Sequence, residues 1–195
     1  MKKQIFYNPN NIYLLVVGRM VKDKGITELV DAFEEVAPQY NGKLKLILVG
    51  PKEDELDPLP NSTLNKIASN ENIIEVGFSN KVAYFMSIAD ILIHPSHREG
   101  FPNVLLQAGV MKCPIICSNI SGNIDIIENE TEGTVFDVKN VSSLVHAIHS
   151  SLDNYIITKE KAENLYQKIV ANFDRSIVQS EYLKLYNTLL EKARF

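Results

Sequence analysis

Six short apolar segments, separated by stretches with helical spacing, constrain the fold more than any other feature of this chain. The continuous apolar run Leu46-Ile47-Leu48-Val49 is typical of a strand that is covered on both faces of a sheet. Between the first two segments, Leu29, Phe33 and Val36 repeat at helical intervals. The predicted strands are residues 12–17, 44–49, 73–76, 91–94, 115–117 and 134–136.

Helical segments follow these strands in turn. Such alternation indicates an α/β fold with a parallel sheet and helices on both of its faces. The last segment, residues 176–195, is amphipathic, and its apolar face could pack on this domain or on a partner. The predicted helices are residues 27–37, 64–69, 82–88, 104–111 and 123–127, followed by three more within residues 141–195.

Length and charge exclude several classes of protein. A chain of 195 residues is long enough for one domain with a real hydrophobic core, so we expect residues 1–195 to form a single domain. A formal net charge of −4 argues against binding to nucleic acid, which requires a basic surface. No apolar run approaches the length of a membrane-spanning helix, and the first residues lack the apolar stretch of a signal peptide. We therefore expect a cytoplasmic protein.

Cysteine and histidine spacing predicts neither a disulfide nor a metal site. Cys113 and Cys117 flank a predicted strand, and at about 3.3 Å per residue they would lie roughly 13 Å apart. That separation is too long for a disulfide, so buried reduced thiols are expected. His146 and His149 lie three residues apart on a predicted helix, but no third ligand is evident, which indicates a surface pair.

Residues 95–108 join an apolar strand to a helix through a tight polar turn. This arrangement places free backbone N–H groups and the positive end of a helix at the carboxyl edge of a sheet. Anions such as phosphate bind at such an edge. Glu99 lies just before the helix, where the helix dipole favours a negative side chain in any case, so a capping role stays open beside a binding role.

A second candidate anion site follows the first predicted strand. The strand ends at Gly18 and Arg19, and a loop with Lys22 and Lys24 leads through Gly25 into the first helix. Glycine lets a ligand approach the backbone, and the two kinds of cation suit a diphosphate. By composition alone, a basic loop of this kind is more often a solvated turn.

Three segments resemble motifs of one enzyme family. Residues 95–108 resemble the "PSxxEGFxxxxxEA" box of retaining glycosyltransferases with the GT-B fold (glycosyltransferase family 4). Residues 18–25 look like its "GR…KG" pair, and residues 114–127 like its "PVVASDxGGxxEII" stretch. The resemblance runs from Asn11 to about Phe173 and is to the donor-binding, C-terminal domain. It implies a Rossmann-like, doubly wound sheet of about six strands in the order 3-2-1-4-5-6, with further helices at the C-terminal end.

The resemblance assigns roles residue by residue. Arg19 and Lys24 would hold the donor diphosphate and stabilise charge on the leaving group, and Glu99 would bind a hydroxyl of the donor sugar. These three are the predicted catalytic residues, and His97 is a further candidate to reach the sugar or the acceptor. The remaining predicted donor-binding residues are Gly18, Gly77, Phe78, Gly100, Phe101, Asn103, Val104 and Gln107.

Some of these residues carry more specific expectations. Gly77 would lie beside the nucleobase, and Phe78 would either cover the base or pack against the next helix. The N–H groups of Asn103 and Val104 would point at the distal phosphate or the sugar. Pro102 has no N–H and cannot join them, although proline is favourable early in a helix.

The chain departs from the family pattern at a few positions. Gln107 replaces the carboxylate that would bind the ribose, and an uncharged amide predicts weaker or altered ribose binding. Asp125 stands where glutamate is usual. Lys112 and Glu130 stand where glycines are common, and both are expected to be left-handed turn positions.

The implied enzyme transfers a hexose from a UDP- or GDP-linked donor with retention of configuration, and needs no obligatory metal or other cofactor. Its partners would be the sugar nucleotide, an N-terminal acceptor domain absent from this chain, and a saccharide or lipid-linked acceptor. The resemblance favours surface polysaccharide synthesis in bacteria, with the missing domain in contact with the inner face of the membrane. Because transfer requires a closed, water-poor site, this chain alone is expected to be inactive.

Two other functions remain open from the sequence. The chain could be a non-catalytic module that binds a nucleotide or a partner and has kept only the fold. It could also be half of a sugar-nucleotide epimerase of similar architecture. Gln107 favours the first alternative slightly, whereas Arg19, Lys24 and Glu99 favour the transferase.

Overall fold

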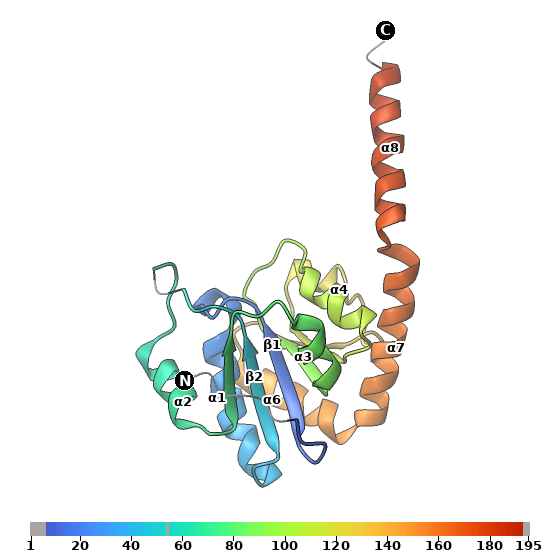
Figure 1. The fold of residues 1–195 in the computed structure, drawn as a ribbon. Coiled ribbons are helices and arrows are strands. Elements are labelled where there is room, and N and C mark those ends of the chain that lie inside the picture. The colour runs from blue at the N-terminus through green and yellow to red at the C-terminus, as the bar shows by residue number, and fades with distance from the viewer. Residues whose placement is uncertain (1–6, 54, 193–195) are drawn as a thin grey trace.

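A six-stranded parallel sheet forms the centre of the computed structural model, which describes residues 7–53 and 55–192 (Figure 1). The strand order is β3-β2-β1-β4-β5-β6, which confirms the predicted doubly wound sheet. β1 and β2 align from Ile12 opposite Leu44 to Val17 opposite Val49. The strands are β1 (Ile12–Val17), β2 (Leu44–Val49), β3 (Ile73–Gly77), β4 (Ile91–His94), β5 (Ile115–Ser118) and β6 (Thr134–Phe136).

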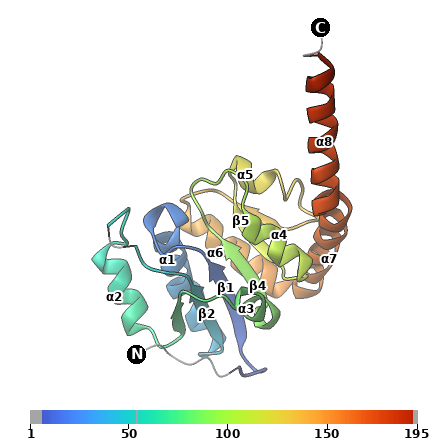
Figure 2. The ribbon, with the colours of Figure 1, turned by 45° about the horizontal axis from the view of Figure 1, so that its top comes forward.

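Helices occupy the connections between strands and cover both faces of the sheet (Figures 1 and 2). α1 and α6 pack on one face, and α3, α4 and α7 pack on the other. Short 3-10 helices η1 (Lys22–Lys24) and η2 (Ala37–Tyr40) flank α1. The α-helices are α1 (Ile26–Val36), α2 (Asn61–Ser69), α3 (Val82–Ile88), α4 (Asn103–Val110), α5 (Ser121–Ile124), α6 (Val141–Asp153), α7 (Tyr155–Asn172) and α8 (Arg175–Lys192).

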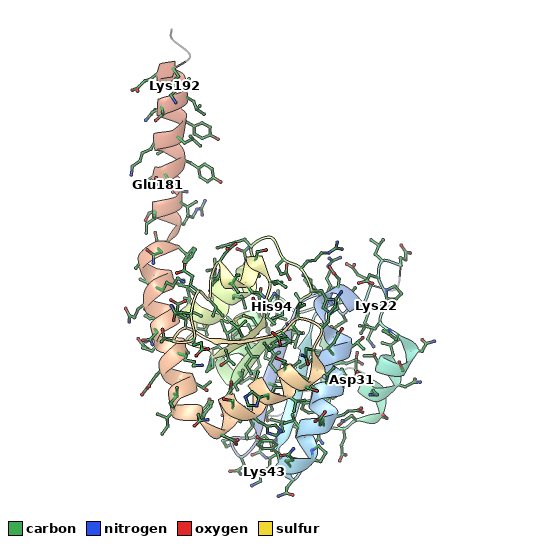
Figure 3. All side chains as sticks on the ribbon, turned by 180° about the vertical axis from the view of Figure 1, so that it is seen from behind. Lys22, Asp31, Lys43, His94, Glu181 and Lys192 are labelled. Atoms are coloured by element: carbon green, nitrogen blue, oxygen red, sulfur yellow. The ribbon has the colours of Figure 1, made fainter. Side chains whose placement is uncertain are left out.

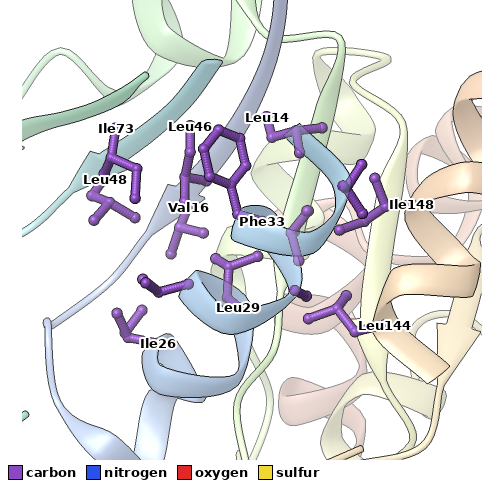
Figure 4. Close-up of a cluster of buried hydrophobic side chains, with 14 of the residues drawn as sticks. Leu14, Val16, Ile26, Leu29, Phe33, Leu46, Leu48, Ile73, Leu144 and Ile148 are labelled. Atoms are coloured by element: carbon purple, nitrogen blue, oxygen red, sulfur yellow. The ribbon is translucent and has the colours of Figure 1, made fainter. Parts of the chain in front are cut away.

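The apolar strands are buried on both faces because the sheet is covered on both. Leu14 and Val16 of β1 belong to the core under α1 and α6, whereas Tyr13 and Leu15 belong to the opposite core. Figure 4 shows Phe33 of α1 above the first of these faces, close to Val16. Side chains that alternate between two buried faces explain why the strands read as continuous apolar runs.

Two predicted helix boundaries differ from the structure. α2 begins at Asn61 rather than at residue 64, and α5 spans Ser121–Ile124 rather than residues 123–127. The Asn123 side chain donates to the carbonyl oxygen of Ser118 at 2.9 Å, which ties α5 to the end of β5. Ile126 and Ile127 are buried beyond the end of this helix, so their apolar character reflects burial in the core rather than a longer helix.

One of the two predicted left-handed turn positions is confirmed. Lys112 has a φ of 53°, whereas Glu130 does not have a positive φ, so that prediction is wrong. In the turn that contains Glu130, Asn129 Oδ1 accepts from the Thr131 N–H at 2.9 Å. Glu132 Oε2 accepts from the Glu128 N–H at 2.9 Å. Side chains thus satisfy the turn's backbone donors without a left-handed residue.

Cys113 and Cys117 are free, buried thiols, as the sequence predicted. Burial raises the pKa of both to about 12, because a thiolate is poorly solvated there. His149 stacks on Tyr40 with ring centroids 6.4 Å apart. Across the described part of the chain, no group of three or more potential metal ligands forms.

α8 projects away from the sheet and its covering helices (Figures 1 and 3). None of its described residues is buried, and Tyr182, Leu185, Tyr186 and Leu189 are more than half exposed on one side of the helix. The expected helix is therefore present and does not pack on this domain, but it is only weakly amphipathic, since Leu183 and Leu190 are exposed as well. None of the described helices combines the length and apolar character that crossing a bilayer requires.

Candidate functional site

The candidate site lies where β1 and β4 are neighbours and the strand order reverses direction (Figure 2). The connections that leave the carboxyl ends of these two strands lie against each other. Gly25, with a φ of 66°, comes so close to β4 that a Cβ atom there would lie 2.1 Å from the carbonyl oxygen of Pro95. A crevice at this reversal point is where open α/β sheets bind ligands.

An ion pair joins the two connections at this point. Lys24 Nζ donates to Glu99 Oε1, and the two side chains are only 19% and 16% exposed. Ser96 Oγ donates to the same oxygen at 2.8 Å, and His94 Nε2 lies 3.2 Å from it. All of these contacts fall on Oε1, and none of the described residues bonds to Oε2. One oxygen of Glu99 is thus held by the protein while the other is free for a ligand.

Glu99 is held in its charged form. Burial by itself would raise its pKa, but contacts with His94, Lys24 and Ser96 outweigh burial and lower the pKa from 4.5 to about 2. A carboxylate with this pKa accepts hydrogen bonds at neutral pH and does not donate a proton. It is therefore suited to bind a hydroxyl group rather than to act as a general acid.

Two further pairs cross between the same connections. Arg98 Nε donates to Asp23 Oδ2 at 2.7 Å, and His97 Nε2 lies 3.1 Å from Glu28 Oε1. The His97 backbone N–H also donates to the carbonyl oxygen of Asp23 at 2.8 Å. His97, a candidate to reach a sugar or acceptor, instead faces the first turn of α1.

Arg19 does not join the Lys24–Glu99 pair. Its side chain is 52% exposed and donates from Nη1 to Glu53 Oε2 at 2.7 Å. The β2–α2 connection, which carries Glu53, also reaches η1 directly, since Asp57 Oδ2 accepts from the Asp23 N–H at 2.7 Å. The structure therefore brings together Lys24 and Glu99, two of the three predicted catalytic residues. The third, Arg19, pairs with the Glu53 carboxylate instead.

α4 begins at Asn103, four residues after Glu99 in the β4–α4 connection. Asn103 and Val104 are its first two residues, so their N–H groups have no acceptor within the helix. Pro102 is the N-cap rather than a helical residue, and its carbonyl oxygen accepts from the Leu105 N–H at 3.0 Å. Free N–H groups and the positive end of the helix dipole favour an anion here.

The turn that contains Gly100 and Phe101 is packed from the β5 side. A Cβ atom at Gly122 would lie 2.6 Å from the carbonyl oxygen of Glu99, so α5 approaches the turn through a residue without a side chain. The ring of Phe101 is about half exposed and lies 5.8 Å from the ring of Phe173. This packing limits how far the turn can move.

The predicted nucleoside-binding residues line two separate cavities. Gly77 borders a cavity of about 380 Å³ together with Met20 and Gly50. Gln107 borders another of about 490 Å³, which lies between α3, α4 and α7 and is mostly apolar. The side chain of Phe78 is 72% exposed, which argues against the alternative that it packs on α3.

Sequence reasoning did not single out Asp23, Glu28, His94 and Ser96 as site residues. A signal was nevertheless present in the pattern of charges. In each connection an acid and a base stand next to each other, Asp23 with Lys24 in the first and Arg98 with Glu99 in the second. Opposite charges in matching order on two neighbouring loops can pair across the gap, as they do here.

The comparisons with known proteins give one consistent result. Residues 1–170 match the family model for glycosyl transferases group 1. The Staphylococcus aureus capsular polysaccharide biosynthesis glycosyltransferase CapM is 27% identical over 185 residues, which cover 94% of this chain and 48% of that protein. The Campylobacter jejuni N,N'-diacetylbacillosaminyl-diphospho-undecaprenol alpha-1,3-N-acetylgalactosaminyltransferase is 26% identical over 194 residues, which cover 97% of this chain and 49% of that protein. The chain thus spans about half the length of these relatives.

Solved structures share the fold. Anabaena Alr3699/HepE, solved in complex with UDP, matches with a TM-score of 0.81 and 22% identity over 91% of this chain and 49% of that chain. The C-terminal domain of a glycosyl transferase group 1 protein (LpcC) from Francisella tularensis matches with a TM-score of 0.75 and 22% identity over 84% of this chain and 87% of that one. The sheet order and these matches together place the chain in the glycosyl transferases group 1 family, with the fold of a GT-B domain.

Proposed function

We propose that this chain is the donor-binding domain of a retaining hexosyltransferase and that it binds a sugar linked to a nucleoside diphosphate. The observation that carries the proposal is the Glu99 carboxylate, which pairs with Lys24 through Oε1 only. It precedes the free N–H groups at the start of α4. A diphosphate is attracted to the helix end and to Arg19 and Lys24 of the β1–α1 connection. The free Oε2 of Glu99 accepts a hydrogen bond from a sugar hydroxyl.

UDP is the nucleotide that we favour over GDP. Structures of Anabaena HepE, which has the same fold, are described as complexes with UDP and with UDP-glucose. The apolar cavity at Gln107 has room for part of a nucleoside, and the Gln107 amide offers both a donor and an acceptor to ribose hydroxyls. An uncharged amide binds these hydroxyls less tightly than a carboxylate.

The chemistry assigned to these residues needs no metal. Arg19 and Lys24 balance the negative charge that grows on the diphosphate as the bond to the sugar breaks. Glu99 holds the sugar so that the acceptor approaches the anomeric carbon from a fixed direction. Neither cation has to lose a proton, and the low pKa of Glu99 keeps it ionised throughout.

An N-terminal acceptor domain is part of the proposal. The relatives are about twice as long as this chain, and the exposed apolar side of α8 is available to pack against further structure. Without that domain the crevice is open to water, so we expect donor binding but negligible transfer from the chain alone. The names of the S. aureus and C. jejuni relatives favour a surface polysaccharide and a lipid-linked acceptor as the setting, at the inner face of the membrane.

Calorimetric titration of the chain with UDP, GDP and UDP-glucose tests the proposal. We expect UDP to bind, and Arg19→Ala to weaken UDP binding about tenfold or more because a charge-assisted contact to the diphosphate is lost. Glu99→Ala should remove the preference for UDP-glucose over UDP and leave the affinity for UDP nearly unchanged. Lys184→Ala on α8, which also removes one cation from an ion pair, is the matched control.

Each result has a contrary outcome. Unchanged UDP affinity in Arg19→Ala would remove Arg19 from the diphosphate site. Loss of UDP binding in Glu99→Ala with the sugar preference intact would refute the role of Glu99. If the chain binds UDP-glucose but no transfer appears after it is joined to an acceptor domain, the non-catalytic module is the better description.

A further inference from the structure

Three side-chain contacts join the β4–α4 connection to the β1–α1 connection and the first turn of α1, and one of them involves a pair of predicted catalytic residues. Lys24–Glu99 is that pair, with Asp23–Arg98 on one side and Glu28–His97 on the other. We call these three contacts the connection clamp. Because the clamp crosses from one loop to the other, it fixes the distance between the cation and the carboxylate that the donor would meet.

The two flanking contacts are not equivalent. The Arg98 side chain is 83% exposed, and an ion pair in that setting contributes little because water screens it. Glu28 and His97 are only 21% and 15% exposed. Glu28 Oε2 and His97 Nε2 are both buried and form no hydrogen bond with the described residues, so the carboxylate has only the close approach of the His97 ring, 3.1 Å from Oε1, and the amino end of α1 to offset its burial.

His97 transmits this contact to Glu99 through a short piece of chain. Its ring lies 3.1 Å from Glu28, and its backbone N–H is fixed to Asp23 at 2.8 Å. Ser96, the residue before it, donates to Glu99 Oε1 at 2.8 Å. Ser96 also accepts at its carbonyl oxygen from Ser118 Oγ of β5, so the turn is held from β5 as well as from the β1–α1 connection.

We propose that Glu28 is a positioning residue for the donor sugar. It touches no ligand, and it acts by holding His97, which in turn keeps the turn in the conformation that holds Glu99 by Oε1 and leaves Oε2 for the donor sugar. This inference rests on the proposed function, since it assumes that Glu99 meets the sugar. Binding groups must be held within a fraction of an ångström of the productive position. Loss of a contact that positions such a group therefore affects ligand binding more than the stability of the fold.

The test compares Glu28→Gln with Glu34→Gln. Both variants remove one carboxylate from α1, but Glu34 pairs with Lys66 of α2, away from the crevice. Calorimetry with UDP and UDP-glucose should show that Glu28→Gln weakens UDP-glucose binding about three- to tenfold while UDP binding changes less than about twofold. Glu34→Gln should leave both affinities unchanged. His97→Ala, which removes the other half of the contact, should reproduce the loss of sugar preference.

A double variant separates positioning from a general structural role. In a Glu99→Gln background, Glu28→Gln should cause no further loss of preference for UDP-glucose, because the group that it aims is already altered. Equal weakening of UDP and UDP-glucose binding in both Glu28→Gln and His97→Ala would overturn the inference, as would no change in either ligand's affinity. Failure of the unaltered chain to bind UDP at all would instead overturn the proposed function.

Discussion

Lys24 and Arg19 lie in the same connection, yet their surroundings differ in almost every respect. Lys24 is mostly buried and paired with Glu99, which is held further by Ser96 and His94. Arg19 is half exposed, and its partner Glu53 comes from a neighbouring loop. The first cation is positioned before any ligand arrives, whereas the second is held by a carboxylate that an incoming phosphate could replace.

This difference separates two tasks within one site. A cation and an acid that are already desolvated need little rearrangement when a ligand binds, which favours exact placement of the sugar. An exposed arginine on a short loop can turn towards a diphosphate from several directions. We therefore expect the Lys24–Glu99 pair to matter more than Arg19 for stability and sugar preference, and Arg19 to act through the diphosphate.

The largest expected effect is on stability, from loss of the buried cation. Lys24→Ala leaves the Glu99 carboxylate in the interior without its charged partner and should lower the free energy of unfolding by about 2–4 kcal/mol. Arg19→Ala removes an exposed pair and should change it by no more than about 0.5 kcal/mol. Urea unfolding followed by far-ultraviolet circular dichroism measures both. Equal losses in the two variants would break the comparison.

The next effect is a dependence of stability on acid pH. The pKa of Glu99 lies at about 2 in the folded chain, below its ordinary value of 4.5. The carboxylate therefore stabilises the fold above pH 4.5, and this contribution is lost as the pH falls from 4.5 towards 2. It amounts to about 3 kcal/mol at most.

Comparison with Glu99→Gln isolates this contribution. The free energy of unfolding of the unaltered chain should fall more steeply between pH 4.5 and pH 2 than that of the variant, which lacks the titrating group. Measurements of unfolding across this window, at constant ionic strength, provide the check. Parallel curves would mean that Glu99 is not the carboxylate that the clamp stabilises.

The smallest expected effect concerns Glu53, whose carboxylate pairs with Arg19 and would compete there with the diphosphate. Glu53→Gln removes the carboxylate that occupies the guanidinium and should raise UDP affinity about two- to threefold, as expected for an exposed ion pair. Glu55→Gln is the matched control, because it removes one charge from the same loop and the described residues give Glu55 no ion pair. A similar gain in both variants would indicate a general field effect.

Most of the fold was predictable from local sequence because apolar runs and helical spacing record burial directly. The six strands and the helices α1, α3 and α4 lie within one or two residues of their predicted positions. The predicted helix boundaries were wrong where apolar residues are buried in the core but lie outside regular helices, as at Ile126 and Ile127. Glu130 was misjudged because side chains, rather than a left-handed residue, complete its turn.

The site was only partly predictable. The sequence indicated that Lys24 and Glu99 both follow strands and would reach the same edge, and the structure places them in contact. It carried no information on the partner of Arg19, since Glu53 belongs to a loop whose path depends on contacts with η1. It also gave His97 a role at the ligand, whereas packing turns the ring towards Glu28.

The sequence by itself determined the doubly wound sheet, the two connections that meet at its reversal point and the family to which these motifs belong. Periodic burial and glycine-containing turns are properties of neighbouring residues, so they can be read from the chain directly. Only the tertiary structure decided which charges pair across the crevice and which oxygen of Glu99 stays free. Those choices change when segments far apart in the chain shift by an ångström or less relative to one another. No local sequence pattern encodes such relative positions.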